Sequence, residues 1–170
     1  AAEGLVLTKI SADGSYGVMV EVNSETDFAA REENFVDYAD TVLETVFSKK
    51  ETDIDSLLAS GLEQSRLALV QKIGENIGVR RAVMQETEGA IVGSYVHSNN
   101  KIAVLVTLRG GDEDLAKDVA MHVAAVSPLV VTAEDVPADV LSKESEIYTA
   151  QAAESGKPAE IVEIMIEGRI

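Results

Sequence analysis

Two segments of the chain each contain a pair of short apolar runs that flank a polar turn. The runs cover residues 5–10 and 16–22 in the first segment, and residues 91–96 and 102–108 in the second. Val18, Val20 and Val22 recur at every second position, which is the period of a half-buried strand. Turn-forming Gly or Asn residues separate the runs of each pair. The sequence therefore predicts two β-hairpins in a small antiparallel sheet.

Long helical patterns lie between and after the hairpins. One starts at Asp27 and buries Phe35, and the next carries an apolar stripe from Leu58 to Ile77. A third is expected to start at the capping residue Asp112. Its predicted buried face consists of Leu115, Val119, His122, Val123 and Val126. Together these patterns predict an α+β fold with helices packed on one face of the sheet.

The last part of the sequence predicts a helical appendage. Residues 138–154 and 159–167 have helical patterns, and Gly156 and Pro158 suit the end of one helix and the start of the next. The expected structure is a C-terminal, coiled-coil-like helical hairpin. We therefore divide the chain into a core over residues 1–136 and a helical hairpin over residues 137–170.

The charge of the chain argues against two classes of binding partner. Its 170 residues include 30 Asp+Glu and 14 Lys+Arg, a formal net charge of −16. Phosphate contacts need clustered cations, so the acidity argues against direct nucleic-acid binding and against docking on an anionic membrane. No apolar run reaches the ~18 residues of a membrane span, and the opening residues show no signal-peptide pattern. The lack of Cys fits a reducing compartment.

Catalytic and metal-binding signatures do not occur in the sequence. It has no Cys and only two His residues, which argues against a thiolate or multi-histidine metal site. A Gly-rich phosphate loop ending in Lys-Ser/Thr and a Gly-x-Ser-x-Gly elbow are also missing. The expected protein is not an enzyme and carries no metal or cofactor of its own.

Three short segments could instead contact another protein. Thr26-Asp27-Phe28 has two interpretations: a helix cap followed by a core residue, or an acidic turn that presents an aromatic anchor. Gly74 either ends a helix or lets another backbone approach closely. His97 is either a surface turn residue or a contact residue. Between residues 21 and 40, seven acidic residues accompany one cation, Arg31.

Several strings, taken together, resemble the signature of the translation elongation factor Ts family. They are EVNSETDFAAR at residues 21–31, KIGENI at 72–77, GSYVH at 93–97, AMHVAA at 120–125, SGKP at 155–158 and EGR at 167–169. The strings cover nearly the whole chain in order. Ser24 stands where members of the family often have Cys.

The resemblance implies a guanine nucleotide exchange factor for elongation factor Tu. It implies that Asp27 and Phe28 enter the GTPase domain near its switch region, where the ring disturbs the Mg²⁺ site. It further implies that Ile73 and Gly74 contact the same domain, and that His97 lies at a contact that perturbs the phosphate-binding loop. The Mg²⁺ and GDP concerned are those bound to the partner.

The chain departs from the full pattern of the family at both ends. Longer members have an N-terminal three-helix module and continue after the helical hairpin with a second half of the core. We expect the middle of a longer factor, or a short variant of the kind that pairs into a homodimer. The alternative function is a non-exchanging structural interaction or dimerisation module of a multidomain ribosome-associated protein.

Overall fold

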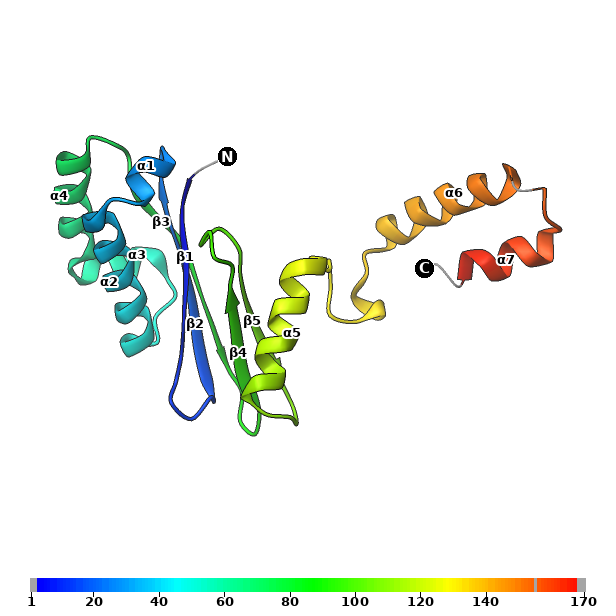
Figure 1. Ribbon diagram of the computed structural model, residues 1–170, viewed down its shortest axis with the longest axis horizontal. Helices are drawn as coiled ribbons and strands as arrows, with labels where there is room; N and C mark the ends of the chain where they lie inside the picture. The colour runs from blue at the N-terminus through cyan, green and yellow to red at the C-terminus, as the bar shows by residue number, and fades with distance from the viewer. Residues whose placement is uncertain (1–2, 155, 168–170) are drawn as a thin grey trace. The chain divides into compact units, whose positions relative to one another are not determined.

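Figure 1 shows the computed structural model, which describes residues 3–154 and 156–167. The chain divides into two compact units, Ala1–Ser127 and Pro128–Ile170. The elements of the first unit are β1 (Glu3–Ile10), β2 (Tyr16–Ser24), α1 (Asp27–Ala30), α2 (Glu33–Lys49), α3 (Ile54–Leu57), η1 (Leu58–Leu62), α4 (Glu63–Ile73), β3 (Gly78–Glu86), β4 (Ile91–Val96), β5 (Ala103–Leu108) and α5 (Glu113–Val126). Those of the second are η2 (Ala133–Asp135), α6 (Ala138–Glu154) and α7 (Ala159–Glu167). The α+β class and both predicted hairpins are confirmed.

The strands form two antiparallel sheets, with the orders β1-β2-β3 and β4-β5. Strand β3 was not predicted, because its polar residues, which include Arg80 and Arg81, hide the alternation of a strand. It pairs with β2 from Tyr16 opposite Glu86, with a shift of register beside Glu21. Strand β3 takes the edge of β2 that β1 leaves open, and the second hairpin forms a separate sheet.

One face of the three-stranded sheet packs against the helices. Val18, Val20 and Val22 of β2 are fully buried, as are Phe35 and Val42 of α2. Each such side chain stabilises the fold by about 1.5–3 kcal/mol when it leaves water. The main apolar core of the first unit therefore lies between this face and α2.

The opposite face of the same sheet packs against the β4-β5 sheet, and Gly17 of β2 lies at this contact. A Cβ added to Gly17 would lie 2.8 Å from Val92 Cγ1 and 3.6 Å from Leu105 Cδ2. Outside β4, α5 is equally close, because a Cβ on Gly93 would lie 2.5 Å from Ala116 Cβ. The first unit thus consists of helices, a three-stranded sheet, a two-stranded sheet and α5 (Figure 1).

Backbone hydrogen bonds tie the two sheets together at both of their ends. The Val6 N–H donates to Asn100 O at 2.8 Å, and the Val92 N–H donates to Gly14 O at 2.7 Å. Because the acceptors lie in turns, each hairpin turn is held by a strand of the other sheet.

Two details of the predicted helices are wrong. Helix α5 buries Ala116 and Ala120, whereas Leu115, His122 and Val126 are exposed. Because Gly93 lets α5 approach β4 closely, the helix packs against β4 with its alanine face and not with the face that carries its larger side chains. Helix α4 ends at Ile73 and therefore does not include Ile77, which is buried just before β3.

The second unit contains the predicted helical hairpin, formed by α6 and α7, with Ala152 buried. Ser155 and the string Gly168-Arg169 lie outside the described residues. The division at residue 136 stays a prediction. Over residues 3–154 and 156–167, no helix combines the length and the apolar character needed to cross a membrane.

Candidate partner-binding site

The turn between β2 and α1 exposes a single aromatic ring. Thr26 is the N-cap of α1, with extended backbone, and its side-chain oxygen accepts a hydrogen bond from the Ala29 N–H at 3.3 Å. Ala29 and Ala30 face inward, while Phe28 is 79% exposed. The interpretation of Phe28 as a core residue is therefore wrong, because α1 buries its small residues and leaves its large one in solvent.

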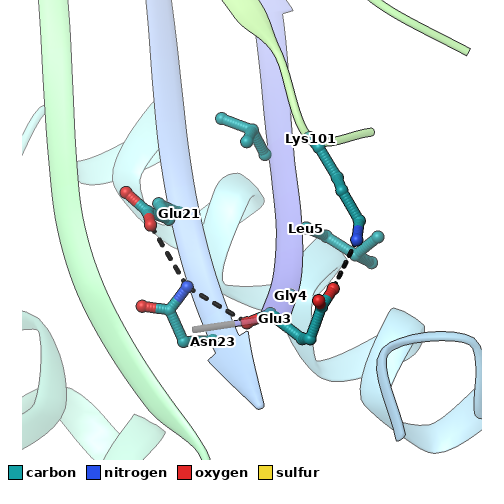
Figure 2. A pocket seen from close by; sticks show the side chains of 7 residues that line it. Glu3, Gly4, Leu5, Glu21, Asn23 and Lys101 are labelled. Atoms are coloured by element: carbon teal, nitrogen blue, oxygen red, sulfur yellow. Dashed lines mark hydrogen bonds and ion pairs between the residues drawn. The ribbon is translucent and has the colours of Figure 1, made fainter. Parts of the chain in front are cut away.

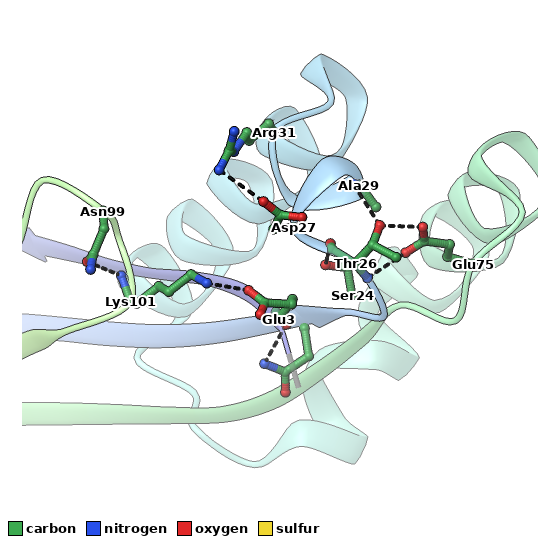
Figure 3. A network of polar contacts seen from close by, with 10 residues as sticks. Glu3, Ser24, Thr26, Asp27, Ala29, Arg31, Glu75, Asn99 and Lys101 are labelled. Atoms are coloured by element: carbon green, nitrogen blue, oxygen red, sulfur yellow. Dashed lines mark hydrogen bonds and ion pairs between the residues drawn. The ribbon is translucent and has the colours of Figure 1, made fainter. Parts of the chain in front are cut away.

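Glu75 holds this turn from outside (Figure 3). Its Oε2 accepts hydrogen bonds from the Thr26 N–H at 3.0 Å and the Glu25 N–H at 3.2 Å. Its Oε1 accepts one from the Thr26 hydroxyl at 2.6 Å. These hydrogen bonds, foremost that from the Thr26 side chain, hold the pKa of Glu75 below its usual value. The end of α4 is thereby linked to the start of α1.

Gly74 ends α4 in the left-handed conformation, with φ of 82°, and its N–H donates to Val70 O at 2.8 Å. No atom lies within 4 Å of a Cβ added there, so the close approach of another backbone does not occur within the described chain. The neighbouring Ile73 is half-buried against the core. A shallow hollow joins Ile73 to the exposed ring, and its lining residues are Phe28, Ala29, Glu32, Lys72, Ile73 and Glu75. The structure thus brings Phe28 and Ile73 together.

Several of the acidic residues in this region already have partners. Asp27 pairs with Arg31 Nη2 at 3.0 Å, four residues along. Glu21, another of the seven acidic residues between positions 21 and 40, pairs with Arg80 at 3.3 Å and with Arg81 at 2.6 Å. The two adjacent arginines of β3 thus share one carboxylate of β2. Glu32 caps α2 by accepting hydrogen bonds from the first N–H groups of that helix.

His97 is exposed in the turn between β4 and β5. Its N–H donates to Ile102 O at 2.9 Å, and its ring meets the Tyr95 ring edge-on, with 6.5 Å between centroids. The same turn continues to Lys101, which forms an ion pair with Glu3 of β1 (Figure 2). His97 does not line the hollow beside Phe28.

A second hollow nevertheless connects this turn to α1. Its rim includes Asp27 and Arg31 on one side and residues 98–101 on the other. Apolar side chains from β1, α1 and α2 also line it. Asp27 therefore borders the hollow that reaches the turn of His97, and Phe28 borders the hollow that reaches Ile73.

The role of Glu75 is not evident from the sequence. This residue lies within the string KIGENI, but its contact is with a turn 49 residues earlier in the chain. A carboxylate directly after a helix-ending glycine was the available signal. This signal does not identify Glu25 and Thr26 as the hydrogen-bond donors, because their proximity depends on β3 and on the path of α4.

Comparisons with known proteins identify the family. Residues 25–170 match the family described as Elongation factor TS. Elongation factor Ts of Hahella chejuensis is 58% identical over 170 residues, which are 100% of this chain and 59% of that protein. The protein of the same name from Cellvibrio japonicus is 60% identical over 170 residues, or 58% of its length. This chain, which spans about three-fifths of the length of these relatives, belongs to the elongation factor Ts family.

Proposed function

We propose that this chain promotes guanine nucleotide exchange on elongation factor Tu during translation elongation. The observation that carries the proposal is the exposed Phe28 ring on a turn that Thr26 and Glu75 hold in place. A large aromatic side chain kept in solvent on an ordered turn is suited to bury itself in a partner. Membership of the family supplies the identity of that partner.

The mechanism needs no proton transfer and no covalent step. A bound nucleotide is held by its phosphate-binding loop and by Mg²⁺, so a ring that shifts the elements around the Mg²⁺ site weakens GDP binding. By thermodynamic linkage, GDP weakens binding of the factor by the same ratio. The chain therefore acts as an exchange factor and not as an enzyme, and the Mg²⁺ and GDP belong to its partner.

The other predicted residues have distinct roles in this proposal. Asp27 can exchange its surface pair with Arg31 for a contact on the GTPase. The open space beside Gly74 lets a partner backbone approach, and Ile73 adds apolar surface next to Phe28. His97 forms a second contact from the turn that follows β4. We place this activity in the bacterial cytoplasm or in the matrix or stroma of an organelle.

The test follows the release of fluorescent GDP from elongation factor Tu in excess unlabelled GDP. Wild-type chain is expected to accelerate release in a concentration-dependent manner, and Phe28→Ala is expected to abolish most of that acceleration. Met121→Ala is the matched control, since Met121 is an exposed apolar residue of α5. It should accelerate release as wild type does.

Two results would count against the proposal in different ways. No acceleration by wild type at high concentration would exclude exchange activity in this chain and favour the alternative, a structural interaction or dimerisation module. Full acceleration by both Phe28→Ala and Asp27→Ala would leave exchange intact but refute the site. Size-exclusion chromatography without the partner measures self-association separately.

A further inference from the structure

We propose that Glu75 is a positioning residue for the partner-binding turn, an inference that rests on the proposed function. Its carboxylate accepts three hydrogen bonds, and all three come from Glu25 and Thr26, the residues that precede Asp27 and Phe28 (Figure 3). Glu75 itself need not touch the partner. Its role is to fix the direction in which the Phe28 ring leaves the surface.

The turn gains little stability from its own helix, because α1 has only four residues, too few to be stable through its own hydrogen bonds. Other support comes from the Thr26 cap, from a hydrogen bond of the buried Ser24 hydroxyl to Thr26 O at 2.8 Å, and from the burial of Ala29 and Ala30. The N–H groups of Glu25 and Thr26 themselves donate to Glu75. A turn that is ordered before association loses less conformational freedom when it binds, so preorganisation strengthens binding.

The same carboxylate also sets the spacing of two contact segments. Glu75 directly follows Ile73 and Gly74, and its hydrogen bonds reach the residues next to Asp27 and Phe28. Glu75, Phe28 and Ile73 line the same hollow. A partner therefore meets the end of α4 and the start of α1 as one preformed surface.

The charge of the group distinguishes positioning from simple packing. All three contacts come from N–H or O–H donors, so an ionised carboxylate can accept all of them. A glutamine keeps one acceptor oxygen but replaces the other with an NH₂ group, which cannot accept. Glu75→Gln should therefore retain part of the effect, and Glu75→Ala none of it.

Two readouts on the full chain test the proposal. The first is amide hydrogen exchange at Glu25 and Thr26 in the free protein. The second is the concentration of the chain that gives half-maximal acceleration of GDP release from elongation factor Tu. The control is Glu44→Gln, which removes one carboxylate charge from an exposed ion pair with Lys9.

We expect Glu75→Ala to remove the protection of both amides and to raise the half-maximal concentration about tenfold. Glu75→Gln should give an intermediate value, and Glu44→Gln should match wild type. In a Phe28→Ala background, the further substitution Glu75→Ala should change the half-maximal concentration less than about twofold, because the two residues act as one unit.

Unchanged amide protection in Glu75→Ala would overturn the proposal whatever the exchange data show. The proposal would also be overturned if Glu75→Ala lost the amide protection but kept the wild-type half-maximal concentration for GDP release. This outcome requires that Phe28→Ala is impaired in the same release assay. If wild type itself gave no acceleration, the proposed function would fail, while lost protection would still support Glu75 as the residue that positions the turn.

Discussion

The two faces of the β1-β2-β3 sheet are covered in opposite ways. Toward α2, large side chains such as Phe35 and Val42 are fully buried against the valines of β2. Toward β4 and β5, Gly17 of β2 leaves no room for even one added carbon, because a Cβ there would lie 2.8 Å from Val92 Cγ1. The first face is thus packed by large side chains from both sides, whereas at the second a glycine lets the side chains of β4 and β5 reach the backbone of β2.

This difference predicts which substitutions each face tolerates. Removing volume should be most harmful beneath α2. Adding volume should be most harmful at the two close glycine contacts, which are Gly17 against β4 and β5, and Gly93 of β4 against α5. The residues proposed to bind the partner lie at the rims of the two layers. Phe28 comes from the helical side and His97 from the second sheet, so binding can be altered without loss of either packing arrangement.

The strongest test of the comparison uses the two phenylalanines. Phe35→Ala should lower the free energy of unfolding by about 3–5 kcal/mol, because it opens a cavity in the core beneath α2. Phe28→Ala should change it by less than about 0.5 kcal/mol, because that ring is in solvent. Urea unfolding followed by circular dichroism measures both values. Equal losses from the two variants would contradict the assignment of one ring to stability and the other to binding.

The opposite substitution, which adds volume, tests the close glycine contact between β4 and α5. In Gly93→Ala the new methyl group would lie 2.5 Å from Ala116 Cβ and 2.7 Å from Ala116 C. Because the obstacle is partly the backbone of α5, we expect a loss of about 2 kcal/mol in the free energy of unfolding.

Gly78→Ala is the matched control, since Gly78 also lies in a strand but has no atom within 4 Å of an added Cβ. It should stay within about 0.5 kcal/mol of wild type in urea unfolding. A wild-type value for Gly93→Ala would mean that α5 and β4 are not packed as closely as described.

A polar contact beneath α2 gives a smaller effect with a pH signature. The Tyr38 hydroxyl donates to Leu62 O at 3.2 Å, and burial raises the pKa of Tyr38 to about 12. Tyr38→Phe should cost about 1 kcal/mol at neutral pH, because the carbonyl loses its donor.

The pH dependence of the same pair has a defined sign. Since the pKa in the folded state lies above the ordinary value of 10.0, the stabilisation is complete below pH 10 and is lost as pH rises through about 12. Unfolding free energies of wild type and Tyr38→Phe should therefore converge at alkaline pH. A constant difference from pH 8 to pH 12 would contradict burial of this hydroxyl.

The smallest effect is expected at the surface pair between Asp27 and Arg31. The Arg31 side chain is 76% exposed, so Arg31→Ala should change the free energy of unfolding by no more than about 0.5 kcal/mol. Thermal unfolding at low and high salt measures this value. A larger loss would mean that the pair helps to hold α1, and that the turn is stabilised by more than its caps and Glu75.

The α+β class and the hairpins could be predicted from the sequence because local alternation and turn residues specify them. The partition into two sheets could not, since β3 carries polar residues and is a strand only through its pairing with β2. The exposure of Phe28 was likewise open, because a cap followed by Phe fits both a buried and an exposed ring. The contact of Glu75 with Thr26 depends on how α4 returns to α1, which no local pattern specifies.

The acidic residues around Phe28 have a consequence for how the protein behaves while no partner is present. An exposed ring can adhere to any apolar surface, including that of another copy. Glu25, Glu33 and Asp37 are exposed near it in the chain, and the whole molecule has a net charge of −16. Copies therefore repel one another once their surfaces come within about 8 Å in physiological salt, the distance beyond which charges are largely screened. The ring stays in water until a surface of opposite potential approaches. The acidity thus protects the exposed Phe28 ring from non-specific self-association.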